Sequence, residues 1–366
     1  MSEVFFTDLK SSNEESILSK LKKLVKMAGF EKINFKDKFT AIKIHFGEPG
    51  NMAFIRAQYA RVIADLVIEN GGKPFLTDCN TLYVGGRKNG IDHLESAYRN
   101  GFVPYVTGCH VIIADGLRGA DEEPVFVGGE YVESAKIGKA IADADIVISM
   151  NHFKGHELTG MGGALKNLGM GSGSRAGKME MHSSGKPSVY AEKCVGCGKC
   201  KAICAHDAIK IEAKKASINH AHCVGCGRCL AVCPMDAIMA DFNQANDVLN
   251  KKIAEYAKAV ISGKEHFHIN FVVDVSPACD CHACNDIPIV SDVGIFASFD
   301  PVAIDVASAE AVNQQAVAPG SVLEKKHKAG EDYFDSVSRG TNWRVCTDYA
   351  SKIGLGDTSY ELIRCK

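Results

Sequence analysis

Two cysteine-rich stretches organise this chain: Cys194-Val-Gly-Cys197-Gly-Lys-Cys200-Lys-Ala-Ile-Cys204 and Cys223-Val-Gly-Cys226-Gly-Arg-Cys229-Leu-Ala-Val-Cys233-Pro234. Each carries the C-x2-C-x2-C-x3-C spacing with which bacterial-type ferredoxins hold a 4Fe-4S cluster. The alignment continues beyond the ligands, because CVGCGKCKAICAHDAIKI matches CVGCGRCLAVCPMDAIMA without a gap. The chain therefore contains an internal duplication, and each copy has the spacing of a cluster-binding run.

The duplicated cysteines predict two 4Fe-4S clusters with interleaved ligands. In two-cluster ferredoxins the fourth cysteine of each run binds the other cluster. We therefore assign one cluster to Cys194, Cys197, Cys200 and Cys233, and the other to Cys223, Cys226, Cys229 and Cys204. Zinc also binds pairs of cysteines, and it is the alternative reading of these residues. Eight cysteines in duplicated ferredoxin order disfavour zinc.

Composition and charge limit the other classes of function. The chain has 366 residues, of which 46% are hydrophobic and 23% charged, and its net charge of −2 gives no overall attraction to nucleic acid or to anionic membranes. No apolar run approaches the ~20 residues of a membrane span, and the first residues lack a secretory pattern. Cluster ligands must be free thiolates, so we expect a cytoplasmic protein in a reducing, oxygen-poor cell. The isolated cysteines, expected to be small buried hydrophobic residues, are Cys79, Cys109, Cys346 and Cys365.

Apolar periodicity alternates between helix and strand on both sides of the cysteine stretches. Strands are predicted over 39–46, 74–77, 111–114, 146–150 and 268–275, and helices over 17–25 (capped by Ser12), 54–69, 91–100, 135–143, 246–260 and 301–313. This alternation predicts an α/β fold with a mainly parallel sheet and helices on both faces. We expect a discontinuous body of residues 1–186 plus 242–366, with residues 187–241 inserted as a ferredoxin-like α+β module.

A third group of cysteines follows the predicted strand 268–275. Cys279, Cys281 and Cys284 lie within six residues, with Asp280 and His282 among them. Ligands commonly bind at the carboxyl ends of strands in open α/β sheets, so these cysteines are candidates for a third metal or cluster. Two alternatives remain: a Cys281/Cys284 dithiol that cycles in redox chemistry, and a loop with a structural role only.

A glycine-rich segment, residues 151–178, follows the predicted strand 146–150. Backbone N–H groups and basic side chains in such a segment can hold an anion. The candidate catalytic residues are His152, Lys154, His156, Lys166 and Asn167, and the candidate cofactor-binding residues are Gly162, Gly163, Arg175 and Lys178. Neither a dinucleotide fingerprint nor P-loop spacing is present, so the indication of a flavin or nucleotide is weak. Residues 45–48 and 78–80, also at strand ends, could join this crevice or serve as caps and turns.

The chain resembles the uncharacterised iron-sulfur centre proteins of anaerobic bacteria and archaea, a domain-of-unknown-function family. The matching stretches are NHFKGHELTGMGGALKNLGMGSGSRAGK (151–178), the two cysteine quartets, ACDCHACND (278–286) and DVGIFASFDPVAID (292–305). The resemblance covers nearly the whole chain. It implies an α/β body with a ferredoxin-like insert, and it implies no particular reaction.

These patterns together predict an iron-sulfur oxidoreductase of anaerobic metabolism. We expect low-potential electrons, exchanged with a ferredoxin-like donor or acceptor, to pass through two 4Fe-4S clusters to a site near residues 279–284 and 151–178. The basic residues there would place an anionic small molecule and supply protons. One alternative is a non-catalytic electron carrier or an iron-sulfur or metal assembly protein. In another, the clusters reduce a flavin or nucleotide bound by the α/β body.

Overall fold

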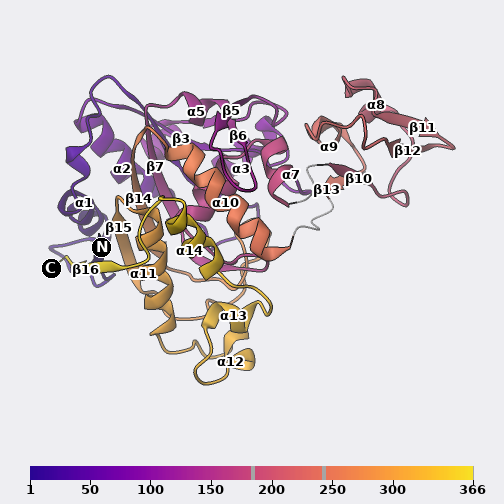
Figure 1. Ribbon diagram of the computed structural model, residues 1–366. Helices are drawn as coiled ribbons and strands as arrows, with labels where there is room; N and C mark the ends of the chain where they lie inside the picture. The colour runs from indigo at the N-terminus through magenta and orange to yellow at the C-terminus, as the bar shows by residue number, and fades with distance from the viewer. Residues whose placement is uncertain (183–185, 241–244, 366) are drawn as a thin grey trace.

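An eight-stranded sheet forms the centre of the computed structural model, which describes residues 1–182, 186–240 and 245–365 (Figure 1). From one edge to the other, the strands are β16 (Tyr360–Arg364), β1 (Ser2–Thr7), β15 (Gly294–Ser298), β14 (Glu265–Val272), β7 (Ile146–His152), β2 (Phe39–Lys43), β3 (Lys73–Asp78) and β4 (His110–Ile113). Only the two pairs that involve β15 are antiparallel in this sheet. The expected mixed α/β fold with a mainly parallel sheet is thus confirmed.

Short strands and helices complete the described chain. The short strands are β5 (Glu122–Phe126), β6 (Ser134–Gly138), β8 (Lys154–His156), β9 (Gly160–Gly162), β10 (Pro187–Val189), β11 (Ile209–Glu212), β12 (Lys215–Ile218) and β13 (Ile238–Ala240). The helices before the cysteine module are α1 (Ile17–Met27), η1 (Phe30–Lys32), α2 (Ala57–Glu69), α3 (Gly90–Arg99), α4 (Pro104–Thr107), α5 (Lys139–Asp143), α6 (Ala164–Ser172) and α7 (Arg175–His182). The others are α8 (Lys199–Ile203), α9 (Arg228–Val232), α10 (Asn246–Ile261), α11 (Pro301–Asn313), α12 (Val322–Lys326), α13 (Tyr333–Val337) and α14 (Arg344–Lys352).

Two hydrophobic cores lie on opposite faces of the sheet. Helices α1 and α2 contact one face, where Phe267, Ile269 and Phe271 of β14 point into the core. Helices α6 and α11 contact the other face, and α10 and α14 extend that layer. On that second face, β7 and β14 contribute the buried polar residues Asn151 and Asn270 near their carboxyl ends. Because side chains alternate along a strand, the same strands build an apolar core on one face and a polar floor on the other.

The structure corrects two local predictions. Residues 135–143 are not one helix, because β6 pairs with β5 and only residues 139–143 are helical. Ala135 and Ile137 are buried on alternate positions, which is strand periodicity. The cap of α1 is Ser16 rather than Ser12, because the Ser16 hydroxyl accepts the N–H of Ser19. Strands β1, β15 and β16 were not expected from the sequence.

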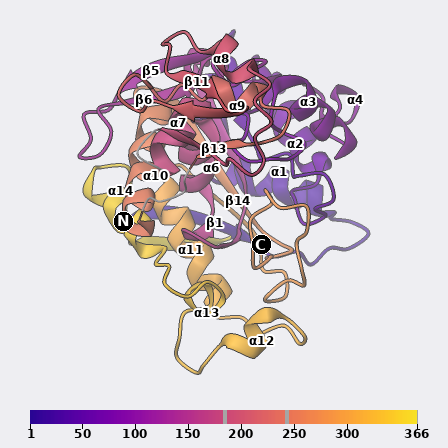
Figure 2. The same cartoon turned by 90° about the vertical axis from the view of Figure 1, so that its right-hand side faces the viewer.

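Strands β10 to β13 and helices α8 and α9 form a small module beside the sheet (Figures 1 and 2). Strand β10 pairs with β13, which brings the two ends of the module together, and β11 pairs with β12. The predicted boundary at residues 241 and 242 lies outside the described residues. Among the described helices, none combines the length and apolar character that crossing a membrane requires.

Candidate functional site

The two cysteine stretches fold alike at the predicted offset. Helices α8 and α9 begin directly after Gly198 and Gly227, which have φ of 78° and 68°. Asp207 and Asp236, which correspond in the two copies, also have positive φ, 46° and 47°. Left-handed backbone is uncommon for residues other than glycine. The repeat in sequence is therefore also a repeat in conformation.

Each predicted ligand set lines its own small hollow in the module. One hollow is lined by Cys194, Cys197, Cys200 and Cys233, and the other by Cys204, Cys223, Cys226 and Cys229. All eight cysteines are free of disulfide bonds. The backbone N–H of Ala216 donates to Cys194 Sγ, and that of Ala237 donates to Cys233 Sγ, each at 3.3 Å. Four thiols around one hollow, with amides directed at sulfur, are a donor set that fits a 4Fe-4S cluster.

A cavity of about 490 Å³ opens in the body where the parallel strands β2, β3, β7 and β14 end. It is lined by most of the expected residues: His152, Lys154, His156, Gly162, Gly163, Lys166, Asn167, Lys178, Cys279 and Cys281. His45, Glu48, Asp78 and Cys79, from the two other strand ends, line it too. Cys284 is exposed, and Arg175 is buried beside the module; neither lines the cavity. The cavity lies where ligands usually bind in open α/β sheets.

Cys279 lines the cavity beside a lysine and a second cysteine. Lys166 Nζ lies 3.5 Å from Cys279 Sγ. A hydrogen bond from the Cys281 thiol, together with Lys166 and His156, holds the pKa of Cys279 well below its usual range, although burial opposes this. The same hydrogen bond and burial raise the pKa of Cys281. A thiolate at Cys279 beside a thiol at Cys281 is the arrangement that these groups favour, and the thiolate is the form that binds metals and attacks electrophiles.

Asp280 pairs with two predicted catalytic residues. It is completely buried, and its carboxylate lies 2.9 Å from His152 Nδ1 and 3.3 Å from Lys154 Nζ. Burial raises the pKa of Asp280, but His152 and Lys154 outweigh burial and hold it below the usual range. His152 Nε2 lies 2.9 Å from the carbonyl oxygen of Val273, so both ring nitrogens face acceptors. Both ring nitrogens of His152 are therefore engaged, which fixes the orientation of the ring.

Asn167 belongs to a buried polar network under α6. Its amide nitrogen donates to Asn151 Oδ1 at 2.7 Å, and Asn151 donates to Asn270 Oδ1 at 2.9 Å. Asn270 donates in turn to Asp305 Oδ1 at 2.8 Å. The Asp305 carboxylate also accepts the first two backbone N–H groups of α6. This network joins α6, β7, β14 and α11, and it fixes the helix that carries Lys166.

Two charged residues in or behind the cavity wall were not predicted from the sequence. Lys43 does not line the cavity but is fully buried behind it, where it donates to Asn167 Oδ1 at 2.7 Å and lies 3.0 Å from Asp78. Arg87 lines the cavity and donates to Glu48 at 2.9 Å. Burial lowers the pKa of Lys43, and Asp78 only partly offsets this. The signal for Lys43 in the sequence was a lysine within the mainly apolar run FTAIKIHF, because a charge at a core position of a strand needs a partner.

The module and the cavity share a wall. Leu82 lines the cavity and also belongs, with Met179, to the hydrophobic cluster of the module. Lys88 of the body forms an ion pair with Asp236 of the module and donates to the carbonyl oxygen of Cys233 at 3.2 Å. The cysteines of the module are thus packed against residues that reach the cavity.

The fold and the site define a class: mixed α/β proteins with a mainly parallel sheet, a cavity of charged and apolar side chains at the strand ends and a cysteine-rich module inserted in the chain. The sequence profile of the family described as "Domain of unknown function (DUF362)" matches residues 40–310. The chain belongs to this family.

Other similarities are partial. The thylakoid-associated protein sll1697 of Synechocystis sp. is 29% identical over 126 residues, which are 33% of this chain and 34% of that protein. The lactate racemase apoprotein from Thermoanaerobacterium thermosaccharolyticum matches 75% of this chain and 51% of its own, with 12% identity and a TM-score of 0.36. A structural-genomics protein from Thermotoga maritima matches 71% of this chain and 50% of its own, with 12% identity and a TM-score of 0.35. This chain spans only about a third of the curated relative and half of each solved chain.

Proposed function

We propose that this protein is an iron-sulfur oxidoreductase of anaerobic metabolism, which exchanges electrons with a ferredoxin-like partner and acts on a small anionic molecule in the body cavity. The observation that carries the proposal is the separation of the eight duplicated cysteines into two quartets, each around its own hollow. When bound there, two 4Fe-4S clusters supply single electrons at low potential. The shared wall at Leu82 supports a route from the module to the cavity.

Lysine side chains at the cavity favour an anion as its ligand, although Glu48, Asp78 and Glu157 line it too. Lys166 has Cys279 Sγ as its hydrogen-bond partner, and Lys178 Nζ donates to the carbonyl oxygens of Gly171 and Gly173. Lys178 has no carboxylate among its hydrogen-bond partners in the described part of the chain. His156 accepts the N–H groups of Leu158 and Thr159 at Nδ1, so its proton lies on Nε2, on the side of Cys279. These residues can hold an anionic group and deliver protons as electrons arrive.

The cavity also bears on the two alternatives, a non-catalytic carrier or assembly protein and a body that binds a flavin or nucleotide. A volume of about 490 Å³ is within the ~300–1,000 Å³ of small-molecule sites. A protein that only carried electrons or clusters would need the module and no such cavity, so the cavity favours an enzyme. Optical spectra of protein purified without oxygen would reveal a flavin, if one is the occupant.

The test of the proposal is the iron content of protein purified without oxygen. We expect about eight iron atoms per chain and, after reduction, the EPR signals of two interacting 4Fe-4S clusters. Cys226→Ser should remove one cluster and leave the other, whereas Cys109→Ser, a buried cysteine outside both quartets, should leave both. Protein with zinc and no cubane iron in the module would refute the proposal.

A further inference from the structure

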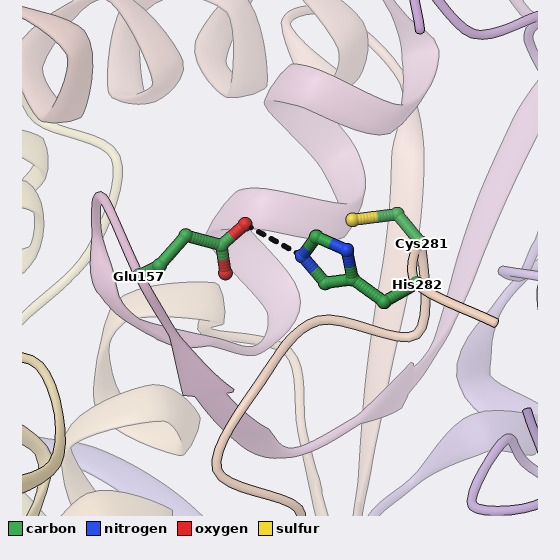
Figure 3. A group of neighbouring side chains, drawn as sticks. All are labelled: Glu157, Cys281 and His282. Atoms are coloured by element: carbon green, nitrogen blue, oxygen red, sulfur yellow. Dashed lines mark hydrogen bonds and ion pairs between the residues drawn. The ribbon is translucent and has the colours of Figure 1, made fainter. Parts of the chain in front are cut away.

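Three side chains at the mouth of the cavity carry nitrogen, oxygen and sulfur donors close together. The ligand atoms of Glu157, Cys281 and His282 all lie within 4.8 Å of one another, and all three residues line the cavity. Figure 3 shows them coming from two segments of the chain, with the carboxylate facing the imidazole. Glu157 lies in the turn between β8 and β9, and the other two lie in the loop after β14.

We propose that Glu157, Cys281 and His282 bind a divalent cation with the ligand preferences of Zn²⁺, at a site that opens into the cavity. Zinc takes thiolate, imidazole and carboxylate ligands, and a site with three protein ligands leaves one position for water or substrate. Cys281, which is a thiol without a metal, releases its proton when the cation binds. Adjacent ligands around tetrahedral zinc are separated by roughly 3.5 Å. Small side-chain rotations would bring these donors to that spacing.

The backbone holds the two donor segments together. The N–H of Gly155 donates to the carbonyl oxygen of Ser276 at 2.9 Å, which ties strand β8 to the cysteine loop. A Cβ at Gly155 would lie only 2.4 Å from the carbonyl oxygen of Pro277, so a larger residue would push the loop away. Glu157 follows two residues later, and its carboxylate lies 2.9 Å from His282 Nε2. The approach of the segments is therefore built into the backbone and does not depend on the ion pair alone.

This donor set differs from the three thiols expected from the sequence. Cys284 is exposed and lies outside the cavity lining, whereas Cys281 lines it. An ion pair between Glu157 and His282 would explain those two side chains without a metal. That pair does not involve the Cys281 thiol, which lies in the same 4.8 Å group and is hydrogen-bonded to Cys279.

A cation here would complete the anion site of the cavity. Lys178 lines the same cavity and donates to the carbonyl oxygens of Gly171 and Gly173. A metal ion with an open position would bind an oxygen of a small carboxylate or similar oxyanion, while Lys178 neutralises remaining charge. This substrate class rests on the proposed function, but binding of the metal does not require the iron-sulfur clusters.

The experiment is a titration of the complete protein, purified without oxygen and treated with a chelator, with Zn²⁺ and with Co²⁺. Cobalt bound through a thiolate gives an intense sulfur-to-metal absorption band. We expect one Co²⁺ per chain bound outside the cluster module, with that band present. His282→Ala, Glu157→Gln and Cys281→Ser should each weaken binding at least ~tenfold, since even supporting residues of metal sites typically contribute that much. The difference spectrum against protein without cobalt removes the absorption of the clusters.

Cys284→Ser is the matched control, because it removes a thiol from the same loop and leaves the proposed donors in place. It should bind cobalt like the unmodified protein. If Cys284→Ser weakens binding as much as Cys281→Ser while His282→Ala has no effect, three thiols hold the metal and the proposal is wrong. It is also wrong if the unmodified protein gives no thiolate band. EPR of the clusters, recorded on every variant, checks folding and shows separately whether the proposed function fails.

Discussion

Arg175 was expected to bind a cofactor in the glycine-rich segment, but it lies between the body and the module. Its guanidinium is fully buried, donates from Nε to the carbonyl oxygen of Arg118 at 3.1 Å and from Nη2 to that of Lys88. A Cβ at Gly227 would lie 2.8 Å from Arg175 Cγ, so the side chain packs directly on the second cysteine run. Burial lowers the pKa of Arg175, and the neighbouring Asp115 and Cys229 oppose this. A buried positive charge therefore lies beside the proposed second cluster.

Arg175→Gln should lower the reduction potential of the cluster on Cys204, Cys223, Cys226 and Cys229. A nearby cation favours the more negative reduced state, so its removal should lower the potential by on the order of tens of millivolts. An EPR-monitored redox titration measures this for each cluster. Arg339→Gln, which removes an exposed arginine paired with Glu331, is the control and should leave both potentials unchanged. Equal reduction potentials in Arg175→Gln and the unmodified protein would contradict the placement of the second cluster beside Arg175.

At the scale of elements, α6 depends on a carboxylate supplied by another helix. Gly163 precedes α6 and has no side chain to cap it, and Asp305 of α11 accepts the N–H groups of Ala164 and Leu165 at 2.7 and 2.9 Å. A Cβ at Gly163 would lie 2.2 Å from Asp305 Oδ1. Burial raises the pKa of Asp305 to about 6, although Asn270 and these two amides oppose it. Asp305 thus fixes the start of α6, the helix that carries Lys166, but its ionised form is destabilised by burial.

This raised pKa predicts a pH-dependent difference between the unmodified protein and Asp305→Asn. The unfolded pKa is about 3.9, so the folded state holds the proton more tightly, and this contribution to stability is lost as pH rises through about 6. From pH 5 to 7.5, the free energy of unfolding of the unmodified protein should fall by about 1 kcal/mol relative to Asp305→Asn. Urea unfolding followed by the fluorescence of Trp343 measures the difference. A difference independent of pH would show that the Asp305 pKa is not raised.

At the scale of the whole molecule, the first and last described strands of the cysteine module lie side by side. Pro187 pairs with Ala240 in the β10 and β13 ladder, so the chain leaves and re-enters the body through adjacent residues. The two large cores contain no residue of the described module, and the module has its own cluster of buried residues. The body should therefore be able to fold without it.

Replacement of residues 188–239 by a short Gly-Ser linker tests this independence. Paired residues on antiparallel strands are only about 5 Å apart, so a short linker spans the gap. We expect the shortened protein to unfold cooperatively, to contain no cluster iron, and to keep cobalt binding at Glu157, Cys281 and His282. Circular dichroism and the cobalt titration measure these properties. Loss of cooperative unfolding would show that the body requires the module, which buries the apolar side chains of Leu82 and Met179.

Predictions from the sequence were most successful where the signal is local. Helix α11 has the predicted bounds 301–313, because Asp300 caps it and Pro301 occupies its first position. Strand β16 was missed because it is a short strand at the edge of the sheet, with exposed residues such as Leu362 and no clear alternation. Its pairing with β1 joins the two ends of the chain, and no local pattern encodes such a contact.

The sequence by itself determined the two cysteine quartets, the alternation of strand and helix, and the candidate segments 151–178 and 279–284. Ligand spacing and periodicity act over a few residues, so they can be read from the chain. Only the tertiary structure decided which distant side chains meet: Cys281 with Glu157, Arg175 with the module, and Lys43 with Asp78. These contacts depend on the order of strands in the sheet and on how closely backbones can approach, as at Gly155. Interactions between distant parts of the chain set the strand order and the approach of the backbones. The residues of the site could therefore be identified only in the folded protein.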